Sequence, residues 1–449
     1  MSVQGAEVAK RRTRGSDRRI RRRGEGHPAF VWLFLAGLIA NLFAGNAYLL
    51  GLPLGLDRPL FLLAALLVVL DPSIERLRPR AVFAVMGACV AWSLWSWIST
   101  GGVRETVKAF ALADRVVVPF LMFALGALIF STPARRTLLL KVLVVLGVYL
   151  GITAIGEISG TTALVWPHWI LDPGLGIQFG RARGPFLYSE PMGMTGGLCL
   201  FAAGLLAFQS GGWWRRAAVV CVVLSLVTVV LSLTRTAWIG TLAAVVVVGL
   251  AVPRMRRWLP AVLAGLAALL VLLLLAAPSL TALLTERLTT ERSVYDRALT
   301  NAAAGRIIET YPLEGVGWGR FVAVSPEFVR QADTYPLTNT GIEVHNVFLA
   351  RAAETGLIGA ALWGLAMLLG PIRSVMTPAS TAEMQGWRVL ALAGIVIWLF
   401  PTMLSPNNYP LPNNLVWLIG GIAGRALLVR PAWASRTRPP ELDAAEGAL

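Results

Sequence analysis

Four arginines and one histidine lie in the polar segments that interrupt an otherwise apolar sequence. Arg181 and Arg183 belong to the stretch R-A-R-G-P-F, and Arg235 lies in a tight turn between two apolar runs. Arg306 opens the segment G-R-I-I-E-T-Y-P-L-E-G-V-G-W-G-R-F, and His345 ends the polar stretch that follows it. Guanidinium groups bind diphosphates through bidentate hydrogen bonds, and a neutral imidazole accepts protons from hydroxyl groups. These residue types predict anion binding combined with proton transfer.

Several other chemistries lack their motifs. The sequence has no G-x-x-x-x-G-K-[ST] loop for nucleotide phosphates, no H-E-x-x-H motif, and no D-x-D pair in the polar loops. We therefore expect neither nucleotide hydrolysis, nor a metal site, nor a cofactor. A substrate used without these aids must arrive activated, and a sugar linked to a lipid diphosphate is one such substrate.

The composition indicates a polytopic membrane protein. Of 449 residues, 56% are hydrophobic and 14% are charged, and the mean hydropathy is +0.67. The formal net charge of +16 is explained by basic residues between apolar spans, which orient a membrane protein, so nucleic acid is not an expected partner. The three cysteines lie within apolar runs without metal-type spacing and are expected to be small buried residues.

The helices that must position the polar segments follow from the apolar runs. A template of about 20 apolar residues finds about twelve candidate membrane spans. They are Phe30–Leu50, Leu52–Leu70, Ala81–Ile98, Val107–Phe130, Leu138–Ile158, Met192–Phe208, Ala217–Leu233, Thr236–Val252, Leu259–Ala277, Val347–Gly370, Val389–Phe400 and Leu415–Val429.

The same pattern divides the chain. Residues 1–28 form a basic tail, residues 29–430 a membrane domain and residues 431–449 a second tail, with both tails predicted to be cytoplasmic. Most basic residues fall in the first tail and in every second loop, as the orientation rule requires. The two substantial outer loops are 159–191 and 278–345, and helical spacing in Thr281–Ala304 predicts an amphipathic helix in the second. Arginines that lie in these outer segments run against the orientation rule.

Three motifs together resemble the O-antigen ligase and polymerase family. They are L-S-L-T-R-T-A-W-I-G around Arg235, the segment that begins at Gly305, and His345-Asn346 followed by Gly356. The resemblance extends over most of the chain from Leu138 onward. One departure is the turn Thr-Arg-Thr, where the family more often has Ser-Arg-Gly.

The resemblance implies an all-α membrane glycosyltransferase of the GT-C type in the bacterial inner membrane, with its site facing the periplasm or the cell exterior. Its donor would be an oligosaccharide on a polyprenyl (undecaprenyl) diphosphate, and its acceptor a lipid A core for a ligase or another glycan for a polymerase. By this resemblance His345 and Arg235 are catalytic residues, and the donor diphosphate is bound by Arg235, Arg306 and Arg183, with Arg181 as a competitor of Arg183. No metal or cofactor is implied.

Simpler interpretations stand beside these. The arginines can contact lipid head groups, Arg306 can pair with a glutamate of its own loop, and His345 with Asn346 can cap a helix. Contacts to sugars are predicted for Trp318, Tyr311, Arg320 and Asn346, although aromatic residues gather at any membrane interface. Asp114 and Arg115 are predicted to mark an internal polar contact. A flippase or secondary transporter is the alternative function.

Overall fold

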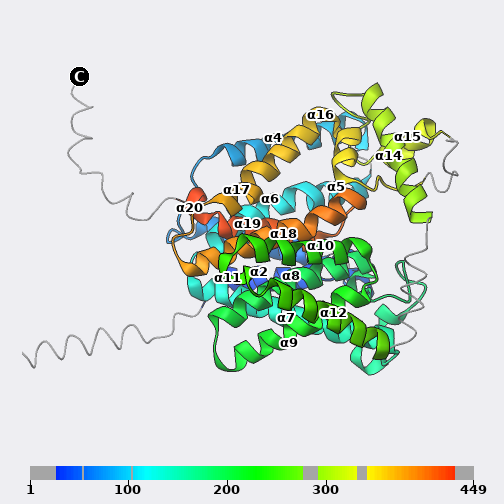
Figure 1. Cartoon of the computed structure of the whole chain (residues 1–449). Helices are drawn as coiled ribbons and strands as arrows, with labels where there is room; N and C mark the ends of the chain where they lie inside the picture. Colours follow the sequence, from blue (N-terminus) through cyan, green and yellow to red (C-terminus); the bar gives the residue numbers. More distant parts are fainter. Residues whose placement is uncertain (1–26, 53–54, 103–104, 277–291, 331–340, 430–449) are drawn as a thin grey trace, which may run out of the picture.

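The described part of the chain is a helical bundle (Figure 1). The computed structural model describes residues 27–52, 55–102, 105–276, 292–330 and 341–429, and in these ranges the only β pairing is one isolated bridge between Leu77 and Val429. The expected all-α fold is confirmed there. Most of the two predicted tails, together with 278–291 and 331–340 of the long outer loop, lie outside the described residues.

The helices follow one another with short connections. The longer ones are α2 (Ala29–Asn41), α3 (Asp57–Leu70), α4 (Ala81–Ser99), α5 (Thr106–Leu112), α6 (Val118–Ile129), α7 (Pro133–Ser159), α8 (Ser189–Gln209), α9 (Gly212–Leu231), α10 (Arg235–Ala251), α12 (Leu259–Ala276), α14 (Arg292–Thr310), α15 (Phe321–Phe328), α16 (Val347–Met367), α18 (Ala382–Leu404) and α19 (Pro410–Ala423). The short ones include α11 (Pro253–Arg256), α17 (Arg373–Met376) and α20 (Arg425–Leu428), and π-helical turns join α5 to α6 (η3, Ala113–Val117) and α16 to α17 (η7, Leu368–Ile372).

Seven helical segments in the described ranges are long and apolar enough to cross a membrane. Three further apolar helices, Ala29–Asn41, Arg235–Ala251 and Leu259–Ala268, are shorter than this within the described residues, so the number of crossings stays a prediction. The seven are Ala81–Ser99, Val107–Ile129, Pro133–Ser159, Ser189–Gln209, Gly212–Leu231, Val347–Met376 and Ala382–Leu404.

Several predicted spans have different bounds in the structure. The first helix ends at Asn41 instead of continuing to Leu50. Turns follow it, and among them Gly45 has a φ of 88°. The span predicted from Val389 to Phe400 is longer at both ends, since α18 runs through Pro401 to Leu404. The outer connection between α18 and α19 is correspondingly shorter, because α18 ends at Leu404 and α19 begins at Pro410.

The centre of the bundle is formed where α19 packs against α6. Nearly all of α19 is buried. A Cβ atom built on Gly421 would lie 2.0 Å from the carbonyl oxygen of Phe123, and one built on Gly126 would lie 2.5 Å from that of Leu418. Glycines on both helices therefore permit close backbone approach, which is how helices associate when no solvent drives them together.

The two ends of the bundle hold different segments. In Figure 1, α14 and α15 lie at the right-hand end, whereas α11, α17 and α20 lie at the left-hand end. At the left-hand end, hereafter the basic end, Arg136 pairs with Glu383 at 2.7 Å and Arg388 donates to the carbonyl of Val375 at 2.8 Å. The loops that were predicted to share one membrane face thus meet at one end. The opposite end, called the α14 end, carries the candidate site.

Candidate active site

Helix α16 is broken at Gly356. This residue has φ 68° and ψ 179°, and a Cβ atom on it would lie 1.9 Å from the carbonyl oxygen of Leu313. Only glycine fits there. The segment 312–319 packs into the break and replaces the lost intrahelical hydrogen bonds. The bonds are Leu357 N to Pro312 O (2.8 Å), Val316 N to Ala353 O (2.9 Å) and Gly317 N to Glu354 O (2.9 Å).

The glycine-rich segment and the His-Asn motif therefore form one unit. Gly315, Gly317 and Gly319 all have positive φ values, 72°, 103° and 69°, which the tight packing requires. Asn346 is the N-cap of α16, where its Oδ1 accepts hydrogen bonds from the amides of Phe348 at 2.9 Å and Leu349 at 3.1 Å. The cap fixes the direction in which the helix starts, and with it the place of His345 one residue earlier.

His345 lies in an environment that favours the neutral imidazole. Burial and then the positive charge of Arg297 lower the pKa of His345, while Asp296 and Glu343 oppose the change. Its Nδ1 atom is buried and has no hydrogen-bond partner among the described residues. At neutral pH the ring is therefore uncharged and can accept a proton.

Arg297 on α14 links His345 to Arg235 at the start of α10. Burial lowers the pKa of Arg297 most, and among nearby charges the repulsion from Arg235 comes first, ahead of the attraction from Glu190 and Asp296. Arginine side chains are positively charged at physiological pH. Two cations held this close are stabilised by an anion between them. The α14 end thus has the electrostatics of an anion site, bordered by a neutral histidine.

Polar contacts fix the elements that carry these side chains. Glu190 in the first turn of α8 accepts a hydrogen bond from Ser405 Oγ. The neighbouring Ser189 hydroxyl lies 2.8 Å from that of Thr234, the residue before Arg235. The first turn of α8 therefore connects the Arg235 turn to the loop after α18.

Arg183 is buried, with 1% of its surface exposed. Its side chain donates to the carbonyls of Leu175 at 2.6 Å and Ile170 at 2.9 Å, and its backbone amide donates to Glu157. In this structure the guanidinium group holds together the outer loop 159–191. Because these donors are used within the loop, the geometry favours a structural role over the predicted contact to a diphosphate.

Arg181 contacts the first turn of α8, whereas Arg183 bonds within its own loop. Its NH1 atom lies 3.5 Å from Ser189 Oγ, and Ser189 contacts the turn that carries Arg235. Of the two arginines in R-A-R-G-P-F, Arg181 is the one directed toward the Arg235 turn.

Arg306 lies on α14 but contacts α15. Its NH1 atom donates to the carbonyl of Phe328 at 2.8 Å, and the Tyr311 ring, which is 48% exposed, lies 6.4 Å from the Phe328 ring. Arg320 is the N-cap residue of α15. Arg306 and Tyr311 thus join α14 to α15, and Arg320 begins α15. Both helices lie at the α14 end.

Trp318 is buried, with 1% of its surface exposed. Its indole donates to the carbonyl of Lys108 at 3.2 Å, and the guanidinium carbon of Arg351 lies 4.5 Å from the ring centre. The ring is thus covered by protein. A sugar contact of Trp318 stays a prediction, and this conformation does not favour it.

Sequence reasoning missed Arg297 and Glu190. Arg297 carries no motif that would single it out, although it falls within the predicted amphipathic helix Thr281–Ala304. Glu190 lies just before the span predicted from Met192. A carboxylate close to a membrane span is costly unless it has a function, so the position of Glu190 is the signal that could have identified it. Among the described residues, no three His, Cys, Asp or Glu side chains gather in a way that could hold a metal ion.

The fold and the site define a helical membrane protein with a clustered arginine and histidine site at one end. Residues 220–364 match the family model described as O-Antigen ligase, and this range contains Arg235, Arg297, His345 and Gly356. Over this range the chain is similar to the O-antigen ligase family, which supports the resemblance carried by the Arg235 turn, the segment from Gly305 and the His345-Asn346 motif. No curated protein matches the chain.

Proposed function

We propose that this protein is a membrane glycosyltransferase that transfers a glycan from a polyprenyl (undecaprenyl) diphosphate donor to a sugar acceptor, as a ligase or polymerase. The observation that carries the proposal is the grouping of Arg235, Arg297 and His345 within the range that matches the family. The lipid bilayer is its environment, and the donor lipid reaches the site from the membrane.

The donor diphosphate binds Arg235 and Arg297, with Arg181 as a further contact. The bidentate guanidinium fork matches the phosphate oxygens, and the two positive charges stabilise the leaving diphosphate as negative charge develops on it. Relief of the repulsion between the arginines adds to the binding.

His345 accepts the proton of the acceptor hydroxyl. The hydroxyl oxygen bonds to the anomeric carbon as the bond from that carbon to the diphosphate oxygen breaks, and the electron pair of that bond leaves with the polyprenyl diphosphate. The proton ends on the imidazole, which is neutral because burial and Arg297 lower its pKa. A single displacement from the opposite face inverts the anomeric configuration, and no residue in this scheme requires a metal ion.

The basic end faces the cytoplasm and the α14 end faces the periplasm or cell exterior, because positively charged loops are retained inside. Single cysteines test this orientation, since the native Cys89, Cys199 and Cys221 are all buried. Leu313→Cys, 60% exposed at the α14 end, should react with an impermeant reagent added outside, and Met376→Cys, 75% exposed at the basic end, should not. The reverse pattern would invert the orientation.

The function is tested with the purified protein in liposomes that contain an undecaprenyl-diphosphate-linked oligosaccharide. Two acceptors are supplied, a lipid A core and a second lipid-linked repeat unit, both with and without EDTA. Extension of the first acceptor identifies a ligase and extension of the second a polymerase, and either should persist in EDTA. Movement of the intact donor across the bilayer without transfer to either acceptor would favour a flippase instead.

A further inference from the structure

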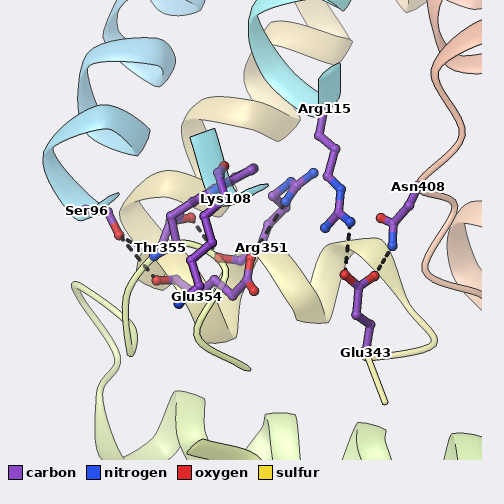
Figure 2. Close-up of polar contacts among 9 residues, drawn as sticks. Ser96, Lys108, Arg115, Glu343, Arg351, Glu354, Thr355 and Asn408 are labelled. Carbon is purple, nitrogen blue, oxygen red and sulfur yellow. Dashed lines mark hydrogen bonds and ion pairs between the residues drawn. The ribbon is translucent and has the colours of Figure 1, made fainter. Parts of the chain in front are cut away.

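A second polar pocket lies beside His345. Arg115 projects from the π-helical turn η3 and donates to Glu343 at 2.9 Å, and Asn408 donates to the other oxygen of the same carboxylate (Figure 2). Arg351 and Glu354 from α16 form the opposite side, and Phe321 contributes an aromatic ring. Side chains that are far apart in the sequence thus converge on one small volume.

Arg351 provides an independent sign that the pocket binds a ligand. It lines the pocket with only 6% of its surface exposed, yet its ion pair with Glu354 is long, at 3.9 Å. Its Nε atom is buried and has no hydrogen-bond partner among the described residues. A buried guanidinium donor without an acceptor costs stability, and a ligand hydroxyl that enters the pocket would supply the missing acceptor.

The polar groups of the pocket suit hydroxyl groups better than a phosphate. Two carboxylates, Glu343 and Glu354, balance the two arginines, Arg115 and Arg351, and they would repel an anion. The pocket therefore offers both strong acceptors and strong donors, together with an aromatic ring. A sugar hydroxyl can donate and accept at once, whereas a phosphate at neutral pH mainly accepts.

We propose that this pocket binds the sugar that receives the glycan, by its hydroxyl groups. The proposal rests on the proposed function and adds the acceptor site to it. Glu343 and Val344 line the pocket and directly precede His345, so a sugar held here presents a neighbouring hydroxyl to the imidazole. The pocket has room for a group of about the size of one water molecule, so a hydroxyl group of the sugar enters it while the ring lies outside.

Saturation-transfer NMR on the full-length protein in nanodiscs tests the assignment. The probes are the methyl glycosides of glucose, galactose, mannose and N-acetylglucosamine, with pyrophosphate as a competitor. At least one glycoside should bind wild-type protein, and pyrophosphate should not displace it. Asn408→Ala should weaken that binding by about fivefold, the worth of one hydrogen bond. Asn46→Ala is the matched control, because Asn46 is a half-buried asparagine bonded to Pro185 O and does not line the pocket.

Glu343→Gln, which keeps the side-chain size, replaces Asn408→Ala if that variant does not fold. Absence of glycoside binding, equal binding by wild type and the pocket variant, or displacement by pyrophosphate would each overturn the acceptor site. Undecaprenyl diphosphate binding and transfer are measured on the same preparation. Transfer without glycoside binding would refute the pocket alone, whereas glycoside binding without any transfer would refute the proposed function alone.

Discussion

At the basic end, arginines bond to neighbouring segments: Arg136 reaches Glu383, Arg388 reaches the Val375 carbonyl, and Arg80 donates to the Leu427 carbonyl at 3.1 Å. At the α14 end, the positive charge of Arg235 lowers the pKa of Arg297 more than Glu190 or Asp296 raises it. The first arrangement ties loops together and needs no ligand. In the proposed function the second arrangement binds the donor diphosphate, so the same residue type would serve assembly at one end and chemistry at the other.

The largest loss of turnover is expected for His345→Ala. A positioned general base contributes roughly 10² to 10⁴ in rate, so turnover should fall by that factor while donor binding changes little. Single-turnover transfer and donor titration separate the two quantities. If turnover persists and only donor affinity falls, His345 is a binding group and the arginines must supply the catalysis.

Replacing Arg235 sharpens the contrast between the ends. Arg235→Ala removes charge that stabilises the leaving diphosphate and should cost about 10² to 10³ in turnover. Arg235→Lys keeps the charge but loses the planar fork, so it should be impaired less. Arg388→Ala, at the basic end, is the matched control and should keep its turnover. Near-wild-type rates for both Arg235 variants at saturating donor would reduce Arg235 to a head-group contact.

The basic end should affect stability and not chemistry. Arg136 is 5% exposed, so Arg136→Ala leaves Glu383 without its partner and should cost about 3 kcal/mol of stability. Thermal unfolding in detergent measures the loss, and turnover per folded molecule should not change. The double variant Arg136→Met with Glu383→Leu should recover much of the stability, because no charge is then left without its partner. Unchanged unfolding together with lost turnover would contradict the division of roles.

The smallest effect concerns the pH dependence of turnover. A general base works only when it is neutral, so turnover falls as the pH drops through the pKa of His345, which lies below its ordinary value. Asp296 raises that pKa, and Asp296→Asn should therefore move the acidic half-point of the profile to lower pH. Arg297→Gln removes a charge that lowers the pKa and should move the half-point upward. Shifts in the same direction for both variants would exclude electrostatic control of His345.

Apolar runs predicted where the helices lie, because a stretch of hydrophobic residues in a membrane has few alternatives to a helix. They did not predict the early end of α2 or the break in α16. The break depends on Gly356, whose φ is positive, and on a distant segment that packs against it. The glycines at 315, 317 and 319 all have positive φ values, as tight turns require. The internal polar contact expected at Asp114 and Arg115 is also present, as ion pairs with Arg58 and Glu343.

The candidate site could be predicted only where a motif marked it. Arg235 and His345 lie in recognisable motifs, and the structure places both at the α14 end together with Arg297. Sequence reasoning selected Arg306, but Arg297 and Arg306 project from roughly opposite faces of α14, because about 3.6 residues make one turn. The sequence does not show which face of that helix meets Arg235, since this depends on packing between segments far apart in the chain.

The measurement that tests the account most directly compares Arg297→Ala with Arg306→Ala in liposomes that contain undecaprenyl-diphosphate-linked oligosaccharide. Both variants remove an arginine from the same helix, but only Arg297 belongs to the cluster with Arg235 and His345. The account predicts that Arg297→Ala loses about 10² to 10³ in glycan transfer per folded molecule, whereas Arg306→Ala transfers at close to the wild-type rate. Loss of transfer in Arg306→Ala with retention in Arg297→Ala would contradict it.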